Sequence, residues 1–415
     1  MSTTTTVTDT TPAAPAPPGQ PDIAYAPDYQ KWQARAARRL GSEALPKTAP
    51  EGFPSRLSGD LVWEGEKLAE TYNWTYVLNE DQLVEIDRAV QHFKSLNLSL
   101  GHLSPETFPL PALHAQLRRL SRELHTGHGF FVLRGLRVDD YAREENAAIY
   151  AGVSSHTAAQ RGRQDHKFDG RPADVVLTHI KDLQVDQIAA GGSAIGSPAY
   201  TTDKQVFHTD SGDIVSLFAL ETAAAGGASK LASTWRVYNE TARTRPDLIH
   251  VLWQNWDYEV FEKADKQWTE RPLMFYSEAT DSRPERIALQ YARRTSSGSG
   301  LCHAAPTSRL SARRRPRRWT PCTSSGASFV LNTDFQKGDM QYVNNLAVFH
   351  ARDGFTDSPE KKRHLLRLWL RDPENAWETP EALRPRWTQL YDDITPGSQV
   401  FPLEPYIRSA SNKSR

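Results

Sequence analysis

The feature that most constrains this chain is the stretch QVFHTDSGDIVSLFAL at 205–220. It places His208 and Asp210 two residues apart, close to the apolar run Ile214–Leu220. Because side chains on a β-strand alternate between faces with a period of two, His208 and Asp210 would point the same way and could hold one metal ion. The pair alone also fits a turn in which Asp210 starts an Asx-turn, so a metal site requires a third ligand.

The best candidate for that ligand is His350, which ends a second strand-like stretch, GDMQYVNNLAVFH at 338–350. Two imidazoles and one carboxylate on one side of a metal leave the opposite positions open, which is the arrangement of non-haem Fe(II) oxygenases. Asn344 and Asn345 would either cap a turn or orient His350. Phe207 points away from His208 and is predicted to be core.

Two arginines follow in RHLLRLWLRD at 363–372. On a strand, one face carries Arg363, Leu365, Arg367 and Trp369, and the other carries Leu366, Leu368 and Leu370. Two arginines on a buried face need anions, and a guanidinium fork pairs bidentately with a carboxylate such as that of a dicarboxylate co-substrate. The alternative is that both arginines are surface charges on a strand.

At these residues the chain resembles the TauD/TfdA (taurine dioxygenase-like) family of Fe(II)- and 2-oxoglutarate-dependent dioxygenases. The resemblance is carried by HTD, a distant VFH and then an arginine, in that order. It extends to GFFVLRGL at 129–136 and GGAS at 226–229, and covers roughly residues 80–372.

The resemblance implies Fe(II), 2-oxoglutarate as co-substrate, and O2. It implies that His208, Asp210 and His350 hold the metal and that Arg363 takes the distal carboxylate of 2-oxoglutarate. Ser229 stands where the family has a threonine that helps bind the co-substrate carboxylate. Arg367 would lie nearer the substrate or help with the same carboxylate.

The reaction implied is oxidative decarboxylation of 2-oxoglutarate to succinate and CO2, coupled to oxidation of a substrate C–H bond. Hydroxylation is the default outcome, and desaturation or ring closure starts in the same way. The presence of Asp210, where related halogenases have a small residue, argues against halogenation. By family analogy the substrate is a small amino-acid-like, sulfonate or carboxylate molecule, as in secondary metabolism.

Two readings from other classes stay open at the level of sequence. A metal-binding cupin-type protein without oxidase activity explains the strands and the His/Asp pair but not Arg363. A nucleic-acid-associated protein would rest on the arginine-rich residues 309–318 alone.

The fold expected is mainly β with flanking helices (α+β), around a double-stranded β-helix or jelly-roll core. Helical periodicity predicts helices at 81–96, behind an Asn79 cap, at 110–125 and at 139–150. Strands are predicted at 129–135 and 173–183, and 189–197 is predicted to be a loop over the mouth of the site.

Composition sets broad limits. The chain has 415 residues and 50 basic against 50 acidic side chains, so no global field favours nucleic acid or an anionic membrane. No run of 18 apolar residues occurs and the start lacks a signal-peptide pattern, so a cytoplasmic protein is expected. We expect a small-molecule substrate, no nucleic-acid partner and no membrane partner. Homo-oligomerisation is undecided.

The expected organisation is a disordered tail at 1–22, an N-terminal extension at 23–78, the dioxygenase domain at 79–372 and a C-terminal extension at 373–415. Residues 295–328 do not fit this plan, because they contain no acidic residue and both cysteines, Cys302 and Cys322. Three explanations are open: translation out of frame or an unspliced gene model, which we favour, a disordered insertion, and a functional basic patch.

Overall fold

The computed structural model describes residues 29–42, 44–192, 195, 197–259, 268–281, 283–292 and 329–409. The predicted tail at 1–22 and the unusual segment at 295–328 lie outside these described residues. The helices are α1 (Tyr29–Ser42), α2 (Gly65–Leu68), α3 (Glu80–Ser95), α4 (His114–Thr126), α5 (Arg143–Thr157), α6 (Gln184–Ala189), α7 (Thr234–Thr244), α8 (Pro246–Trp253) and α11 (Arg384–Tyr391).

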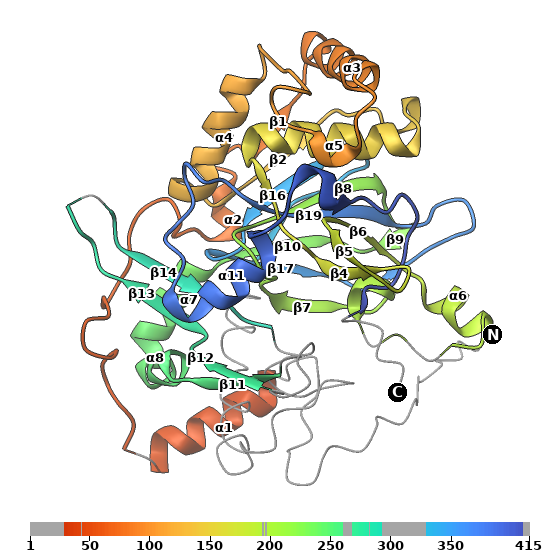
Figure 1. Ribbon diagram of the computed structural model, residues 1–415. Coiled ribbons are helices and arrows are strands. Elements are labelled where there is room, and N and C mark those ends of the chain that lie inside the picture. The colour runs from red at the N-terminus through yellow and green to blue at the C-terminus, as the bar shows by residue number, and fades with distance from the viewer. Residues whose placement is uncertain are drawn as a thin grey trace.

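Two facing sheets form the centre of the molecule (Figure 1). The larger has the order β1 (Thr75–Val77), β2 (Phe130–Arg134), β16 (Met340–Asn344), β8 (Ile214–Glu221), β19 (His364–Arg371) and β3 (Gln160–Arg161), and β6 (Leu177–Lys181) also pairs with β19. The smaller has the order β15 (Leu331–Asn332), β10 (Ser229–Ser233), β17 (Val348–Arg352) and β7 (Gln205–His208). Apart from the parallel β1–β2 pair, neighbouring strands in both sheets are antiparallel. The predicted jelly-roll core is confirmed.

The remaining strands form small ribbons around this core. β11 (Trp256–Glu259) pairs with β12 (Trp268–Arg271), β13 (Met274–Ser277) with β14 (Arg286–Leu289), and β18 (Phe355–Thr356) with β9 (Ala225–Gly226). A three-stranded sheet joins β20 (Gln399–Val400), β5 (Arg171–Val175) and β4 (Asp165–Phe168).

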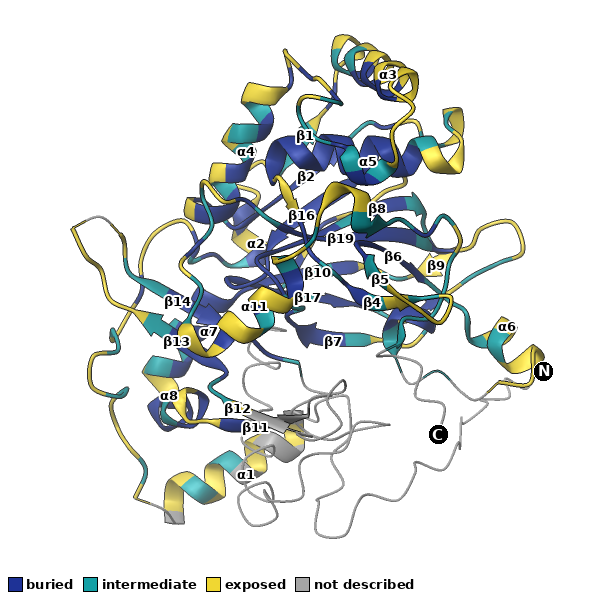
Figure 2. Ribbon diagram, in the orientation of Figure 1, coloured by how far each residue is buried: buried dark blue, intermediate teal, exposed yellow. Residues whose placement is uncertain are grey.

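The central strands β2, β16, β8 and β19 of the larger sheet are mostly buried on both faces, as their dark colour in Figure 2 shows. On one face Leu366, Leu368 and Leu370 of β19 pack in a cluster with α3, α4 and α5. On the other face Trp369 packs with Phe349 of the smaller sheet. The alternation predicted for the strand after Arg363 is therefore confirmed, and it aims Arg367 and Trp369 between the two sheets.

Local predictions are mostly confirmed, with shifted boundaries. Helix α3 begins behind Asn79, whose side chain accepts from the backbone of Gln82 in a capping box. The helix predicted at 110–125 begins at His114, and that predicted at 139–150 runs from Arg143 to Thr157. The single strand predicted at 173–183 is wrong: it is two strands, because β5 and β6 pair in different sheets and Val176 between them donates to Val400 O at 3.1 Å.

The chain segments before and after the jelly roll contribute side chains to its apolar core. Leu57, Leu61 and Trp63 from the N-terminal side are buried in the same cluster as Trp377, Leu383 and Trp387 from the C-terminal side. Both segments therefore contribute buried apolar surface to the jelly roll, which stabilises it.

Candidate metal centre

Three side chains meet between the two sheets. His208 ends β7 and His350 lies on the neighbouring strand β17, where the register places the two residues directly opposite each other. Their ring centroids are 4.2 Å apart, and Asp210 Oδ1 lies 3.6 Å from His208 Nε2. One ligand atom from each of the three lies within 4.8 Å of the others. The structure thus brings together the residues that the sequence predicted to be a metal-binding group.

The tautomer of His208 suits metal binding. Its Nδ1 donates to the carbonyl oxygen of Val206 at 2.9 Å, which leaves Nε2 unprotonated and facing Asp210. In this state Nε2 accepts from Gln205 Nε2 at 2.9 Å. Among the described residues, the buried Nδ1 of His350 has no hydrogen-bond partner.

Asp210 is positioned by contacts rather than by strand geometry. Strand β7 ends at His208, so the pleat does not carry the chain to Asp210. Instead Asn345 clamps the backbone of Asp210: its Oδ1 accepts from Asp210 N and its Nδ2 donates to Asp210 O, both at 2.7 Å. The sequence predicted that Asn344 and Asn345 would cap a turn or orient His350. Asn344 Oδ1 does accept from Leu346 N in the turn, whereas Asn345 orients Asp210.

The carboxylate of Asp210 is also held from the larger sheet. Arg367 Nη1 donates to Asp210 Oδ2 at 2.8 Å, and Trp369 Nε1 donates to the same oxygen at 3.1 Å. Both residues lie on β19. Oδ1 is left facing His208 Nε2, which fixes the oxygen that a metal would meet.

The electrostatics favour a neutral-imidazole, ionised-carboxylate state. Burial lowers the pKa of His350 to about 3, with a further lowering from His208, and burial also lowers the pKa of His208. Burial acts to raise the pKa of Asp210, but Arg367 and the two histidines outweigh it and hold that pKa well below its usual range. These are the protonation states in which the three side chains are metal ligands.

Arg363 lies in a separate buried place, just before β19. Its side chain is only 5% exposed, and its Nη1 has no partner within the described part of the chain. Its guanidinium lies 5.4 Å from the ring of Phe355, and burial lowers its pKa to about 9. A buried guanidinium with a free donor calls for an anion, and a carboxylate supplies two matching acceptors.

The GGAS motif shapes the space around Arg363. Gly227 has φ +72°, and a Cβ there would lie 3.2 Å from Phe355 Cβ and 3.4 Å from Arg363 Cδ. Glycine therefore provides both the left-handed backbone and the room for the arginine. Ser229 is buried on β10, and its hydroxyl donates to Gln341 Oε1 at 3.2 Å.

Arg367 and Arg363 contact different residues. It bonds to Asp210 through Nη1 and to Gln164 Oε1 through Nε at 2.8 Å, and its buried Nη2 has no partner in the described residues. Phe207 is buried in the main apolar cluster, as predicted.

The sequence did not predict a role for Gln164, because an isolated glutamine about 40 residues before His208 gives no signal in the sequence.

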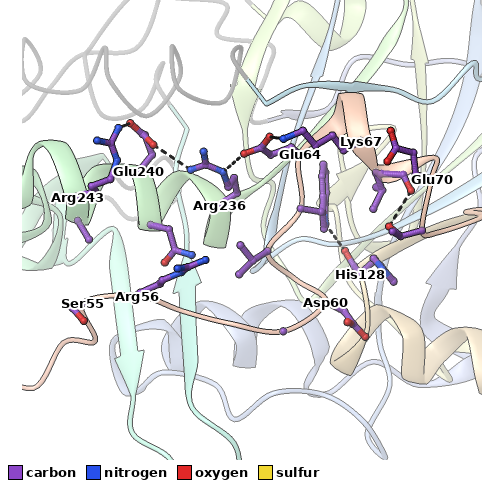
Figure 3. A pocket seen from close by; sticks show the side chains of 17 residues that line it. Ser55, Arg56, Asp60, Glu64, Lys67, Glu70, His128, Arg236, Glu240 and Arg243 are labelled. Carbon is purple, nitrogen blue, oxygen red and sulfur yellow. Dashed lines mark hydrogen bonds and ion pairs between the residues drawn. The ribbon is translucent and has the colours of Figure 1, made fainter.

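A hollow of about 1080 Å³ lies elsewhere, between α7 and residues 55–71 (Figure 3). Its cations are largely paired within its own walls: Arg236 contacts Glu64 at 2.8 Å and Glu240 at 3.3 Å, and Arg243 contacts Glu240 at 2.5 Å. It shares no residue with the metal-binding group, and we assign it no role in the chemistry.

The fold and the centre together define a jelly-roll protein with two histidines and one carboxylate that could hold a metal ion, and with a buried arginine that has an unpaired donor. Comparison with known proteins agrees. Residues 94–369 match the model of the taurine catabolism dioxygenase TauD, TfdA family.

Related sequences extend over most of the chain. It is 32% identical over 356 residues to the taurine hydroxylase-like protein SAT17 of Stachybotrys chartarum, covering 84% of this chain and 89% of the relative. It is 24% identical over 342 residues to FR-33289 synthase of Streptomyces rubellomurinus, covering 80% and 95%.

Solved structures share the fold. Asparagine oxygenase in complex with Fe(II), 2S,3S-3-hydroxyasparagine and succinate has a TM-score of 0.52 at 14% identity, covering 74% of this chain and 98% of that one. The non-heme iron oxygenase OrfP in complex with Fe and alpha-ketoglutaric acid has a TM-score of 0.51 at 14% identity, covering 72% and 93%.

This chain belongs to the TauD/TfdA family. It is a 2-oxoglutarate-dependent non-haem iron dioxygenase that uses Fe(II), 2-oxoglutarate and O2. In the described part of the chain, no helix combines the length and apolar character needed to cross a membrane.

Proposed function

We propose that this dioxygenase oxidises a C–H bond of a small, anionic, amino-acid-like substrate, with His208, Asp210 and His350 as the iron ligands. The observation that carries the proposal is the grouping of these three side chains within 4.8 Å, in the protonation states that a metal requires. Iron bound here, with 2-oxoglutarate and O2, would supply the oxidising chemistry.

We further propose that Arg363 binds the distal carboxylate of 2-oxoglutarate. Its buried, unpartnered Nη1 and the space left by Gly227 support this role. Ser229 would offer its hydroxyl to the same co-substrate, since it lies on β10 beside the strand that carries His350.

Arg367 and Trp369 would keep Asp210 in one rotamer, so that the carboxylate does not have to reorganise when iron binds. The buried Nη2 of Arg367 remains available to an anionic group of the substrate. The relative named as taurine hydroxylase-like is consistent with an amino-acid-like, anionic substrate. Hydroxylation is the expected outcome, and desaturation or ring closure would start from the same oxidation.

The alternative reading as a non-oxidative cupin-type protein is disfavoured, because it leaves Arg363 without a purpose. The nucleic-acid alternative rests on residues 309–318, which lie outside the described residues.

The test is succinate formation from 2-oxoglutarate by the purified chain with Fe(II), ascorbate and O2, in the presence of a panel of small amino and sulfonic acids. We expect turnover that a substrate stimulates and that His208→Ala abolishes. Iron-loaded wild-type protein that forms no succinate with any compound would count against the proposal. A protein re-encoded with the suspected frame of residues 295–328 corrected would then be the next to assay.

A further inference from the structure

A segment near the C-terminus, residues 396–409, is tied to the barrel at several points. Val400 O accepts from Val176 N at 3.1 Å, and Pro402 O accepts from His179 Nε2 at 2.8 Å. At its end, Ser409 N donates to Asp165 Oδ2 at 2.7 Å. The backbone of this segment is therefore fixed on both sides of Arg408.

This anchoring brings Arg408 to the metal centre. Its guanidinium carbon lies 5.5 Å from the indole of Trp369, and that of Arg367 lies 4.9 Å from the same ring. Trp369 in turn donates to Asp210 Oδ2. Arg408 is thus separated from an expected iron ligand by one side chain.

Neutral groups hold the side chain of Arg408. Its Nε donates to Tyr200 Oη at 3.3 Å, and its Nη1 donates to the backbone oxygen of Gln164 at 3.3 Å. Gln164 also accepts from Arg367 Nε through its side chain, so one residue orients both arginines. These contacts position the guanidinium without neutralising it.

Burial acts to lower the pKa of Arg408, but Tyr200 and Asp210 outweigh it, so the guanidinium stays charged without a carboxylate of its own. No carboxylate of the described residues forms an ion pair with Arg408, and the carboxylate of nearby Asp165 accepts instead from the backbone of Ser409. Arg367 has one carboxylate partner, Asp210, which also faces the metal position. Two guanidinium groups in a largely enclosed place with a single shared carboxylate leave positive charge to be compensated.

A count of formal charges indicates how much positive charge remains around Arg367 and Arg408. Fe(II) and Arg363 together carry three positive charges, and Asp210 with 2-oxoglutarate carries three negative ones. Within this set of groups, Arg367 and Arg408 add two positive charges that no other member offsets. Two largely enclosed guanidinium groups of this kind are stabilised by an anionic group between them.

We propose that Arg408 joins Arg367 in binding an oxyanion group of the substrate, which makes the C-terminal segment part of the substrate site. This inference rests on the proposed function, since it presumes that the substrate lies beside iron bound at Asp210. The shared chemistry is a carboxylate, sulfonate or phosphonate. A phosphonate dianion matches two guanidinium groups best.

The test compares four compounds that share one aminoethyl frame: 2-aminoethylphosphonate, 2-aminoethanesulfonate, β-alanine and the uncharged-head-group control ethanolamine. Each is titrated calorimetrically into the full chain loaded anaerobically with Fe(II) and 2-oxoglutarate, at about pH 8, where a phosphonate is largely doubly charged. The visible absorption of the Fe(II)–2-oxoglutarate complex is recorded first, without any probe. Its absence in the wild type would refute the proposed function, independently of Arg408.

We expect wild-type protein to bind the phosphonate most tightly and ethanolamine most weakly. Arg408→Gln should weaken binding of the phosphonate by roughly 10- to 100-fold, the range expected for a lost charge-assisted hydrogen bond, while ethanolamine binding is unchanged. Arg408→Lys should fall between the two. Arg384→Gln, an exposed arginine of the same C-terminal region, is the matched control and should behave as wild type.

Equal phosphonate affinity in Arg408→Gln and wild type would overturn the inference. So would a wild-type protein that binds no anionic probe better than ethanolamine. If Arg408→Gln does not fold, Arg408→Lys carries the test, because loss of the planar fork alone should weaken phosphonate binding several-fold.

Discussion

Arg367 Nη1 lies 2.8 Å from Asp210 Oδ2, so a side chain of the larger sheet fixes a carboxylate that follows a strand of the smaller one. The two residues are 157 positions apart in the sequence, and Trp369 Nε1 donates to the same Oδ2 of Asp210. The metal-binding group therefore depends on how closely the two sheets approach each other.

Removing this contact should weaken iron binding. Arg367→Met is expected to reduce Fe(II) affinity roughly 10- to 100-fold, as is typical when a residue that orients a metal ligand is lost. Anaerobic calorimetric titration with Fe(II) measures the effect. Arg371→Met is the matched control, because Arg371 lies on the same strand but bonds to Asp213 at 2.5 Å. Equal losses in the two variants would show that the effect is not specific to Asp210.

Arg363 should govern the co-substrate and not the metal. Arg363→Gln is expected to raise the KM for 2-oxoglutarate roughly 100-fold, because about 3 kcal/mol of charge-assisted bonding is lost. Fe(II) affinity measured without 2-oxoglutarate should stay at the wild-type value. An unchanged KM would place the distal carboxylate elsewhere.

Gly227 offers a test of the space beside Arg363. Gly227→Ala should lower the free energy of unfolding by about 1–2 kcal/mol, the usual cost of a left-handed non-glycine residue, and should also weaken 2-oxoglutarate binding. The control is Gly170→Ala, since Gly170 has a similar φ of +75° but nothing within 4 Å of an added Cβ. Denaturant unfolding and 2-oxoglutarate titration should separate the variants: both lose stability, and only Gly227→Ala loses co-substrate affinity.

A pair formed by the buried His179 and the half-buried His364 predicts a pH dependence of stability. His179 Nδ1 lies 2.7 Å from His364 Nε2, and burial lowers the pKa of His179 to about 4 and that of His364 to about 3. Unfolded histidines take up protons below about pH 6.5, whereas these two stay neutral in the folded protein. The unfolded state then binds more protons, so stability is lost as the pH falls from about 6.5 toward 4.

The size of this loss is roughly 1 kcal/mol per histidine for each pH unit. Urea unfolding of the metal-free protein at about pH 7.5 and pH 5.5 measures it. The double variant His179→Gln, His364→Gln should lose less stability on acidification than wild type. The same pH dependence in both proteins would assign the effect to other groups.

The sequence by itself determined several local elements and the three metal-binding candidates. A capped amphipathic pattern is sufficient for α3, and the alternation of leucines with Arg367 and Trp369 is sufficient for the faces of β19, because both depend on neighbours a few residues away. The order of HTD, VFH and the following arginines identified the family for the same reason: each motif is a short, contiguous signal.

Only the tertiary structure decided what holds these residues in place. Asp210 takes its direction from Asn345 and Arg367 and not from a strand pleat, and Arg408 reaches Trp369 from near the end of the chain. The break between β5 and β6 likewise depends on the distant Val400. Such contacts arise from strand pairing and segment packing between residues far apart in the sequence, and no local periodicity encodes them.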